Sequence, residues 1–199
     1  MSKSTNKNEH FAQEFYRDQV FSNIEFADKK VMSIEFYKCS FENVDFSKTF
    51  FNSCRFEECS FLQCNLSLVK VTDTSFIDVE FSNCKMIGID WTEAIKPLSF
   101  AFDACKLNSS IFIEMDIRNT KMTNCEIHDI DFDSANLTKV QLNSSDLKGC
   151  KFLNTDLSFA DFSDTINYDI NPNRNKLKKT KFTLPEALSL MNYFDVIIG

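Results

Sequence analysis

The sequence predicts an all-β solenoid of square cross-section, in which each side of a coil is one five-residue unit. Apolar residues recur every five positions through most of the 199-residue chain, the residue two positions before them is usually small or β-branched, and residues 20 apart are often identical. A period of five fits neither an α-helix nor a flat strand. Four five-residue sides instead give a coil that can stack on the next at the ~4.8 Å spacing of paired strands.

The recurring apolar residue, here called the centre of each unit, follows two registers. Steps of five from Phe11 to Trp91 meet 17 centres, and steps from Phe102 to Phe162 meet 13 more, all of them apolar or aromatic. Sixteen of the 22 phenylalanines are centres, which predicts stacked aromatic ladders inside the solenoid. One such ladder consists of Phe21, Phe41, Phe61 and Phe81.

The position two residues before each centre is the second one expected to point inward, and all eight cysteines stand there. Zinc and disulfides are the functional interpretations of the C-x₄-C spacing of Cys54, Cys59 and Cys64. Successive units point from different sides of the square, however, and vertical neighbours have parallel Cβ vectors. We therefore expect the cysteines to be small buried core residues, with no metal and no cofactor.

Nothing in the sequence has the pattern of a catalytic site. His10 and His128 stand alone, and no nucleophile–base pair or paired-carboxylate site is evident. Three glycines cannot supply a phosphate-binding loop. The N-terminus lacks the apolar segment of a secretory signal, and no apolar run approaches the ~20 residues of a membrane span. The expected protein is a cytoplasmic non-enzyme without membrane contact, its cysteines kept as thiols.

The chain divides into three predicted parts. Residues 1–10 are expected to be a disordered polar tail, and residues 11–166 form the repeat, with a break in register at 92–101. Pro97 suits a bulge or a small loop at that break. Such a loop could carry recognition, or it could be a tolerated insertion.

Residues 167–199 are expected to form a polar, basic linker, one short helix and a terminal strand at 195–199. Thr183 and Glu186 have the spacing of a capping box, with Pro185 in the first turn. The helix could cap the last coil or form a symmetric dimer interface. The candidate dimerisation residues are Leu184, Leu188, Met191 and Phe194.

The net charge of −7 is distributed unevenly. Residues 171–199 have a balance of +3, which leaves −10 for the rest of the chain. Many carboxylates stand directly before a centre. A solvated surface is the simplest interpretation, and the balance argues against a general nucleic-acid binder. Ordered negative charge on a rigid rod could also compete for a DNA-binding surface.

The repeat resembles that of the pentapeptide-repeat family, whose consensus is A(D/N)LXX and whose members fold as right-handed quadrilateral β-helices. The matching units are Ala135-Asn136-Leu137, Thr155-Asp156-Leu157 and Ala160-Asp161-Phe162. The ending, with DINP at 169–172, a basic stretch, a Pro-started helix and a final VIIG, is similar to the gyrase-protecting branch. That branch includes the Qnr quinolone-resistance proteins and the microcin immunity protein McbG. The segment at the register break is much shorter here than the loop of Qnr proteins.

The resemblance implies a homodimer, joined through its C-terminal module, that binds DNA gyrase and also topoisomerase IV. It would relieve a poison, either a microcin-type peptide or a fluoroquinolone, by imitating DNA rather than binding it. The alternatives are a scaffold or docking rod for another protein partner, and a metal protein or enzyme built on Cys and His. The candidate gyrase contacts are an outward acidic face of Asp116, Asp131, Asp146, Asp156 and Asp161, with Thr92, Glu93, Lys96 and Pro97 at the break.

Overall fold

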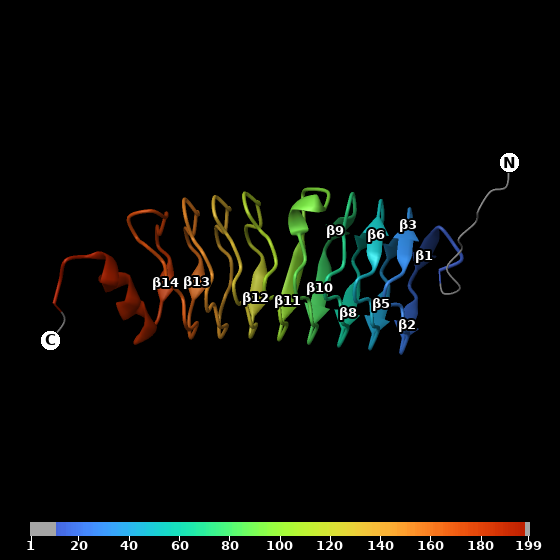
Figure 1. Ribbon diagram of the computed structural model, residues 1–199, viewed down its shortest axis with the longest axis horizontal. Coiled ribbons are helices and arrows are strands. Elements are labelled where there is room, and N and C mark those ends of the chain that lie inside the picture. Colours follow the sequence, from blue (N-terminus) through green and yellow to red (C-terminus); the bar gives the residue numbers. More distant parts are fainter. Residues whose placement is uncertain (1–10, 198–199) are drawn as a thin grey trace.

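The computed structural model describes residues 11–197 as a rod of stacked four-sided coils (Figure 1). The expected disordered tail at 1–10 lies outside the described residues, as do residues 198–199. Successive coils stack along the long axis, with the N-terminal coils at one end and a short helix at the other. Within the described part, no helix has the length and apolar character that a membrane span requires.

Short parallel strands form the sides of the rod, because residues 20 or 21 apart pair between successive coils. The first sheet contains β1 (Phe15–Arg17), β4 (Glu35–Tyr37), β7 (Arg55–Glu57) and β9 (Ser75–Ile77). The second contains β2 (Val20–Ser22), β5 (Ser40–Glu42), β8 (Ser60–Leu62), β10 (Val79–Ser82), β11 (Phe100–Asp103) and β12 (Lys121–Thr123). The other two pairs are β3 (Lys30–Met32) with β6 (Phe50–Asn52), and β13 (Asp161–Phe162) with β14 (Lys181–Phe182).

The four sides, numbered here as faces in chain order, are defined by the residues that directly precede the centres. Beyond the strands, isolated β-bridges continue each face. Face 1 carries β1, β4, β7 and β9 and then Asp116, Asn136, Asp156 and Lys176. Face 2 carries β2, β5, β8 and β10–β14, with Gln141. Face 3 carries Glu25, Asp45, Asn65, Lys85, Lys106, Glu126, Asp146 and Ile166. Face 4 carries β3 and β6, Lys70, and then Asp90, Ile111, Asp131 and Lys151.

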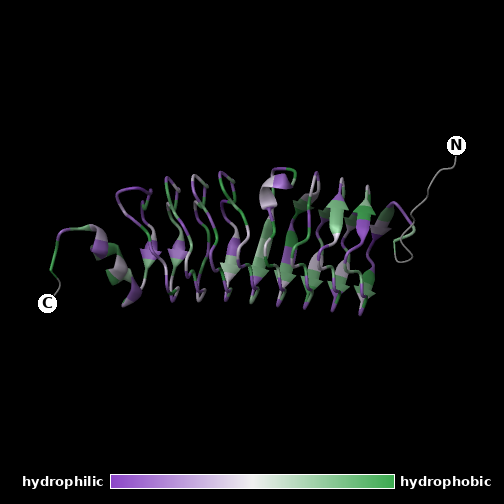
Figure 2. Ribbon diagram, in the orientation of Figure 1, coloured by the Kyte–Doolittle hydropathy of each residue, from purple (hydrophilic) through white to green (hydrophobic). Residues whose placement is uncertain are grey.

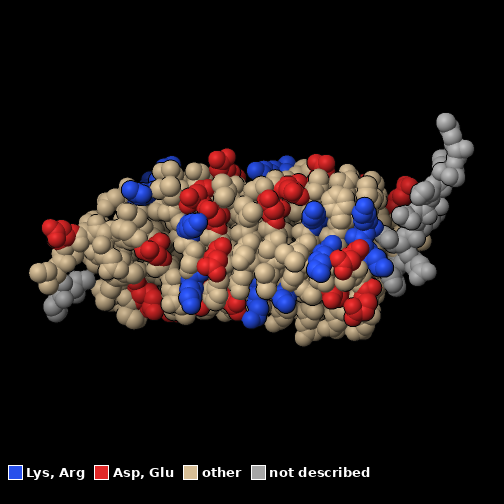
Figure 3. All heavy atoms as spheres, in the orientation of Figure 1, with Lys and Arg blue, Asp and Glu red and all other residues tan. Residues whose placement is uncertain are grey.

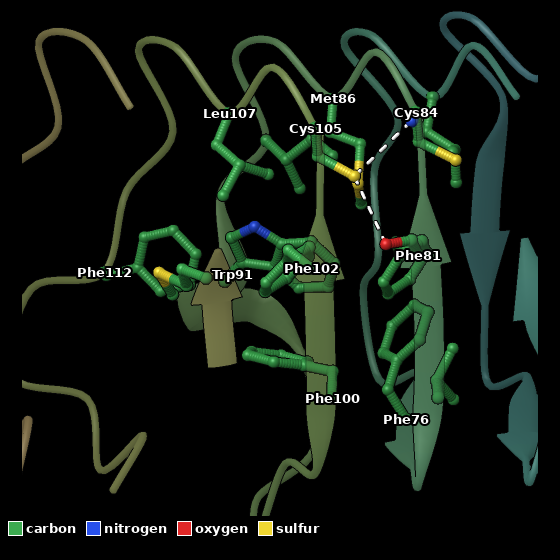
Figure 4. Close-up of a cluster of buried hydrophobic side chains, with 14 of the residues drawn as sticks. Phe76, Phe81, Cys84, Met86, Trp91, Phe100, Phe102, Cys105, Leu107 and Phe112 are labelled. Carbon is green, nitrogen blue, oxygen red and sulfur yellow. Dashed lines mark hydrogen bonds between the residues drawn. The ribbon is translucent and has the colours of Figure 1, made fainter. Parts of the chain in front are cut away.

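The centres fill the interior, and their aromatic rings stack from coil to coil. Phe41 and Phe61 have ring centroids 4.7 Å apart at 15°, and Phe61 continues to Phe81 at 4.9 Å. Trp91 is 1% exposed and packs edge-on against Phe76 at 5.3 Å (Figure 4). Hydrophobic and hydrophilic residues accordingly alternate along the coils (Figure 2). The predicted inward-facing pattern is confirmed.

Many of the buried Cys, Ser and Thr residues two positions before a centre also have a hydrogen-bonding role. Their side chains donate to the carbonyl of a centre in the preceding coil, as Thr49 Oγ1 does to Phe26 O at 2.8 Å. Cys105 Sγ reaches Phe81 O in the same way at 3.3 Å (Figure 4). A small side chain with a donor therefore fits this position, which explains why Cys, Ser and Thr are frequent there.

The corner residue two positions after each centre has a left-handed backbone. Its φ lies between +50° and +75° at the corners with positive φ, from Asp18 to Lys179. Asn, Asp and Gly adopt this conformation most readily, and they occupy many of the corners. Corners with bulkier residues therefore call for another explanation.

The register break is narrower than the expected 92–101. Ser75 still pairs with Ile95, 20 residues on, whereas Val79 pairs with Phe100, 21 residues on. The extra residue therefore enters at 96–99. A 3₁₀ turn, η1 (Trp91–Glu93), precedes this point.

The C-terminal predictions need three corrections. Asp156 pairs with Lys176, and β13 pairs with β14, so residues 167–182 complete a last coil rather than forming a linker. The helix, η2 (Glu186–Tyr193), is a 3₁₀ helix, and Thr183 does not cap it. Thr183 Oγ1 instead accepts from Asp164 N at 2.8 Å, because Thr183 still belongs to the solenoid. Residues 195–197 form no strand, since no described strand lies beside them to pair with.

Candidate partner-binding surfaces

The aspartates that precede the centres support the turns that follow them. Asp156 Oδ1 accepts from Ser158 N at 3.0 Å, and Asn136 Oδ1 makes the equivalent contact with Thr138 N at 3.1 Å. Each such bond satisfies a backbone N–H at a bend that has no ladder partner for it. The same bond is made by Asp116, Asp131, Asp146 and Asp161. Their carboxylates therefore have a structural role that does not depend on charge.

The expected outward acidic face is wrong as a single face. Asp116 and Asp156 lie on face 1, Asp161 on face 2, Asp146 on face 3 and Asp131 on face 4. The chain turns one corner with every five-residue unit. Residues share a face only when one or more whole coils separate them, and Asp131, Asp146 and Asp161 are spaced by 15.

Basic side chains also neutralise most of these carboxylates. Asp116 pairs with Arg118 on face 1. Across successive coils, Lys176 Nζ lies 3.3 Å from Asp156 Oδ2 and Lys181 Nζ 3.3 Å from Asp161 Oδ2. Four of the five candidate aspartates therefore have a basic neighbour: Asp116 has Arg118, Asp156 has Lys176, Asp161 has Lys181, and Asp146 has His128 at 3.0 Å. Positive and negative side chains are accordingly interleaved on the visible surface (Figure 3).

Face 4 keeps a less compensated acidic group, which consists of Asp90, Glu93, Glu114, Asp131 and Asp133. Within residues 11–197 none of these five forms an ion pair. Asp133 Oδ1 is buried without a hydrogen-bond partner in the described part. Burial, followed by the charge of Asp131, raises the pKa of the Asp133 carboxyl.

Exposed apolar side chains lie among the acids of face 4. Ile111 stands between Asp90 and Asp131 in the ladder and is 36% exposed. Ile113 and Leu153 are exposed to a similar extent. An apolar patch rimmed by charge has the composition of a protein interface. This mixture makes face 4 the strongest candidate for partner binding.

The register break borders face 4 and is held firmly at its start. Asp90 Oδ1 accepts from Thr92 N at 3.0 Å and from Thr92 Oγ1 at 2.6 Å. Thr92 therefore lies beside the acidic group of face 4, to which Glu93 belongs, whereas Lys96 and Pro97 lie past the next corner. All four are exposed. The segment is a short excursion whose Leu98 packs back against the core.

The cysteines are buried free thiols throughout the described chain. Burial raises the pKa of Cys59 and of Cys150 to about 12, so both stay protonated at neutral pH. Within residues 11–197, no group of three His, Cys, Asp or Glu residues is arranged to hold a metal ion. His128 is half-buried between Glu126 and Asp146 on face 3.

The helix η2 covers the end of the rod while leaving one side uncovered. Leu190 packs against the core, and the Tyr193 hydroxyl donates to Asp169. The four candidate dimerisation residues point away from the rod. Their exposed fractions are 73% for Leu184, 46% for Leu188, 37% for Met191 and 43% for Phe194. They are accessible, and dimerisation through them stays a prediction.

Sequence reasoning passed over one surface residue, Phe159. It occupies a corner position, has a φ of +61°, and is 43% exposed. Lys178 Nζ and Lys179 Nζ lie 5.9 Å and 6.0 Å from its ring centroid. The sequence could have indicated Phe159, because it is aromatic whereas the neighbouring corner residues of this edge, Asn119 and Lys139, are polar.

Comparisons with known proteins point to one family. The sequence profile of the pentapeptide repeat region matches residues 34–100 and 96–162. No curated protein matches the sequence. Full-length QnrB1, a plasmid-mediated fluoroquinolone resistance protein, is 16% identical with a TM-score of 0.47, over 92% of this chain and all of that one. HetL, involved in heterocyst differentiation regulation in the cyanobacterium Nostoc sp. strain PCC 7120, is 13% identical with a TM-score of 0.46, over 89% and 88%. With its two profile matches and its right-handed quadrilateral β-helix, the chain belongs to the pentapeptide-repeat family.

Proposed function

We propose that this protein is a non-enzymatic rod that occupies the DNA-binding surface of DNA gyrase and thereby protects the enzyme from a poison. The observation that carries the proposal is face 4, where five unpaired carboxylates surround exposed isoleucines beside the register break. The resemblance of the C-terminal ending to the gyrase-protecting branch gives the partner. Topoisomerase IV is the second candidate enzyme, and the proposed compartment is the cytoplasm.

The charge density of the rod sets how it can imitate DNA. About eight coils at ~4.8 Å give a length of roughly 40 Å. A charge of −10 outside residues 171–199 then corresponds to about one net charge per 4 Å, whereas duplex DNA carries one per ~1.7 Å. Charge alone makes the rod a weak competitor. Binding must therefore draw on local contacts, which the acids and isoleucines of face 4 supply.

The exposed side of η2 is the proposed interface of a homodimer. Two copies joined at their C-terminal ends would double the rod and present face 4 twice. Leu184, Leu188, Met191 and Phe194 are the proposed contacts, because they are exposed apolar residues on or beside η2. A dimer would raise affinity for a two-fold symmetric enzyme through multivalency.

The experiment is a gyrase supercoiling and cleavage assay, run with and without a fluoroquinolone or a gyrase-targeting microcin. One variant neutralises three acids of face 4, with Glu93→Gln, Glu114→Gln and Asp131→Asn. The matched control removes three charges elsewhere, with Asp116→Asn, Asp156→Asn and Asp161→Asn. We expect the face 4 variant to need about tenfold more protein for half-protection, which equals ~1.4 kcal/mol. The control should shift by less than about twofold.

Each outcome distinguishes one form of the proposal. Equal losses in both variants would show that overall charge matters rather than face 4. Full protection by both would refute DNA imitation, and absence of any effect by the wild-type protein would refute gyrase protection. If the protein inhibits supercoiling by gyrase in the absence of a poison, this would support binding to gyrase without protection.

A docking rod for another protein is the second candidate function. The interleaved ion pairs favour it, because Arg118, Lys176 and Lys181 neutralise carboxylates that a DNA mimic would leave free. This function predicts no change in supercoiling with or without a poison, and recovery of a different partner by affinity capture.

A further inference from the structure

The corner between faces 1 and 2 brings two lysines close to one exposed aromatic ring and places a third lysine in the preceding coil. Lys139 N donates to Ser158 O at 2.9 Å, and Phe159 N donates to Lys178 O at 2.8 Å. These bonds place Lys139, Phe159 and Lys179 above one another in three consecutive coils, with Lys178 beside them. We call these four residues the Phe159 corner.

The fold does not account for Phe159. A left-handed backbone is unfavourable for a side chain with a bulky Cβ substituent, and the ring stays 43% exposed, whereas the phenylalanine centres of the core are almost fully buried. The core centres already contain the phenylalanines that stabilise the rod. Asn, which is common at the corners, would satisfy the same turn. A phenylalanine here therefore points to a surface role.

The lysines of the corner also lack the partners that others have. Lys176 and Lys181, close in sequence, pair with Asp156 and Asp161. In the described part of the chain, no carboxylate lies within ion-pair distance of Lys139, Lys178 or Lys179. Two of them instead lie near the ring at cation–π distance. Their charges are available to an anionic ligand.

An exposed aromatic ring flanked by unpaired cations matches the chemistry of an unpaired nucleotide. Bases stack on aromatic side chains, while phosphates bind neighbouring lysines. We propose that the Phe159 corner binds a short stretch of single-stranded nucleic acid, with one base on Phe159 and adjacent phosphates on Lys139, Lys178 and Lys179. A duplex would supply the phosphates but keeps its bases stacked, and an acidic peptide would leave the ring unused.

The acidic body of the rod does not prevent such binding. At physiological salt the Debye length is about 8 Å, and the carboxylates nearest the corner, Asp156 and Asp161, are already paired. Face 4 lies on another side of the square. This proposal does not rest on gyrase binding, because it assigns a different ligand to a different surface.

Fluorescence anisotropy of a labelled oligothymidine of about 12 nucleotides tests the proposal. The variants are Phe159→Asn and the pair Lys178→Gln with Lys179→Gln. The matched controls are Leu68→Asn, which replaces another exposed apolar corner residue with φ +60°, and Lys48→Gln at an exposed lysine corner with φ +57°. Circular dichroism and Trp91 fluorescence verify that each variant is folded.

We expect Phe159→Asn to weaken binding about fivefold or more and Leu68→Asn to leave it unchanged. Three phosphate contacts on a single strand predict a slope of log K against log salt of about −2, and removing two lysines reduces it to about −0.7. Three results would overturn the proposal: no binding at roughly 100 μM protein in low salt, equal losses in variants and controls, or equal competition by duplex DNA or polyglutamate.

Discussion

Replacing Asp161 by Ala and by Asn separates the structural role of a carboxylate before a centre from its charge. Asp161 Oδ1 accepts from Ser163 N at 2.9 Å and from Ser163 Oγ at 2.5 Å, and Oδ2 lies 3.3 Å from Lys181 Nζ. An amide oxygen can accept the same bonds from Ser163. Alanine cannot, so Ser163 N would rely on water alone.

The magnitudes follow from these contacts. Losing a hydrogen bond between a charged acceptor and a partly buried N–H costs about 1.5 kcal/mol. Both variants also lose an exposed ion pair, which contributes about 0.5 kcal/mol, so we expect about 2 kcal/mol for Asp161→Ala and about 0.5 kcal/mol for Asp161→Asn. For a chain of this size, the difference of about 1.5 kcal/mol corresponds to a melting temperature roughly 4 °C lower for Ala than for Asn.

The assay is thermal unfolding followed by circular dichroism and by fluorescence of Trp91, the single tryptophan. Asn136→Ala and Asn136→Asp form the matched pair, because Asn136 makes the same turn on face 1 without charge. We expect Asn136→Ala to destabilise the protein through loss of the same turn hydrogen bond as Asp161→Ala, and Asn136→Asp to be nearly neutral. Equal destabilisation by Asp161→Asn and Asp161→Ala would refute the turn argument and assign the effect to charge.

The pH dependence gives an independent test of the same residue. Burial opposes ionisation of Asp161, but hydrogen bonds from Ser163 outweigh it and hold the pKa below its ordinary 3.8. A carboxyl with a lowered folded-state pKa stabilises the protein above its unfolded pKa and loses that contribution as pH falls through the folded value. The advantage of the wild type over Asp161→Asn should therefore be full at neutral pH and disappear below about pH 3.

Three further predictions concern single positions. Asp133→Asn should leave stability unchanged or raise the melting temperature by about 2 °C. The reason is that burial and the charge of Asp131 raise the pKa of the Asp133 carboxyl, so its ionised form is unfavourable in the fold. Clear destabilisation in thermal unfolding would contradict this. Gly149→Ala should cost about 1–2 kcal/mol in urea unfolding, since φ is +75° and the new Cβ would lie 2.2 Å from Asp129 Oδ1; a neutral result would mean that Asp129 moves aside freely. Native protein at pH 8 should leave Ellman's reagent unreacted, given the pKa of about 12 for Cys59 and Cys150, and eight thiols should react after denaturation; rapid labelling of folded protein would show an accessible thiol.

The square solenoid could be predicted from sequence because one physical rule repeats through the chain. Every centre is apolar and the residue two positions earlier is usually small or β-branched, so two registers, separated by one inserted residue, fix most of the inward set from Phe11 to Phe162. The last coil was not predicted because two of its centre positions hold Asn167 and Pro172. Tyr168, one position past the register, is buried in place of Asn167, while Ile170 keeps the second inward position. The prediction that Thr183 caps η2 was wrong for the same reason, since the Thr183 hydroxyl accepts its hydrogen bond from Asp164 N within that coil.

The candidate surfaces were less predictable, because they depend on which side chains meet between coils. The division of the acidic residues over four faces follows from counting in steps of 20 and needed no structure. The pairing of Lys176 with Asp156 and the absence of partners around Phe159 did need it. Both depend on side-chain reach across the ladder, which a repeat consensus does not encode.

The turn geometry also clarifies what the acidic residues mean for function. Asn and Asp make the same bond at the position before a centre, as Asn136 and Asp156 show within one ladder. Folding therefore does not decide between them, and charge at this position must be explained by what it meets at the surface. On face 1 the charges meet Arg118 and Lys176, which accounts for them within the rod. Asp131 on face 4 has Lys151 as its ladder neighbour but forms no ion pair within the described chain, so its charge is the one that a partner would have to explain.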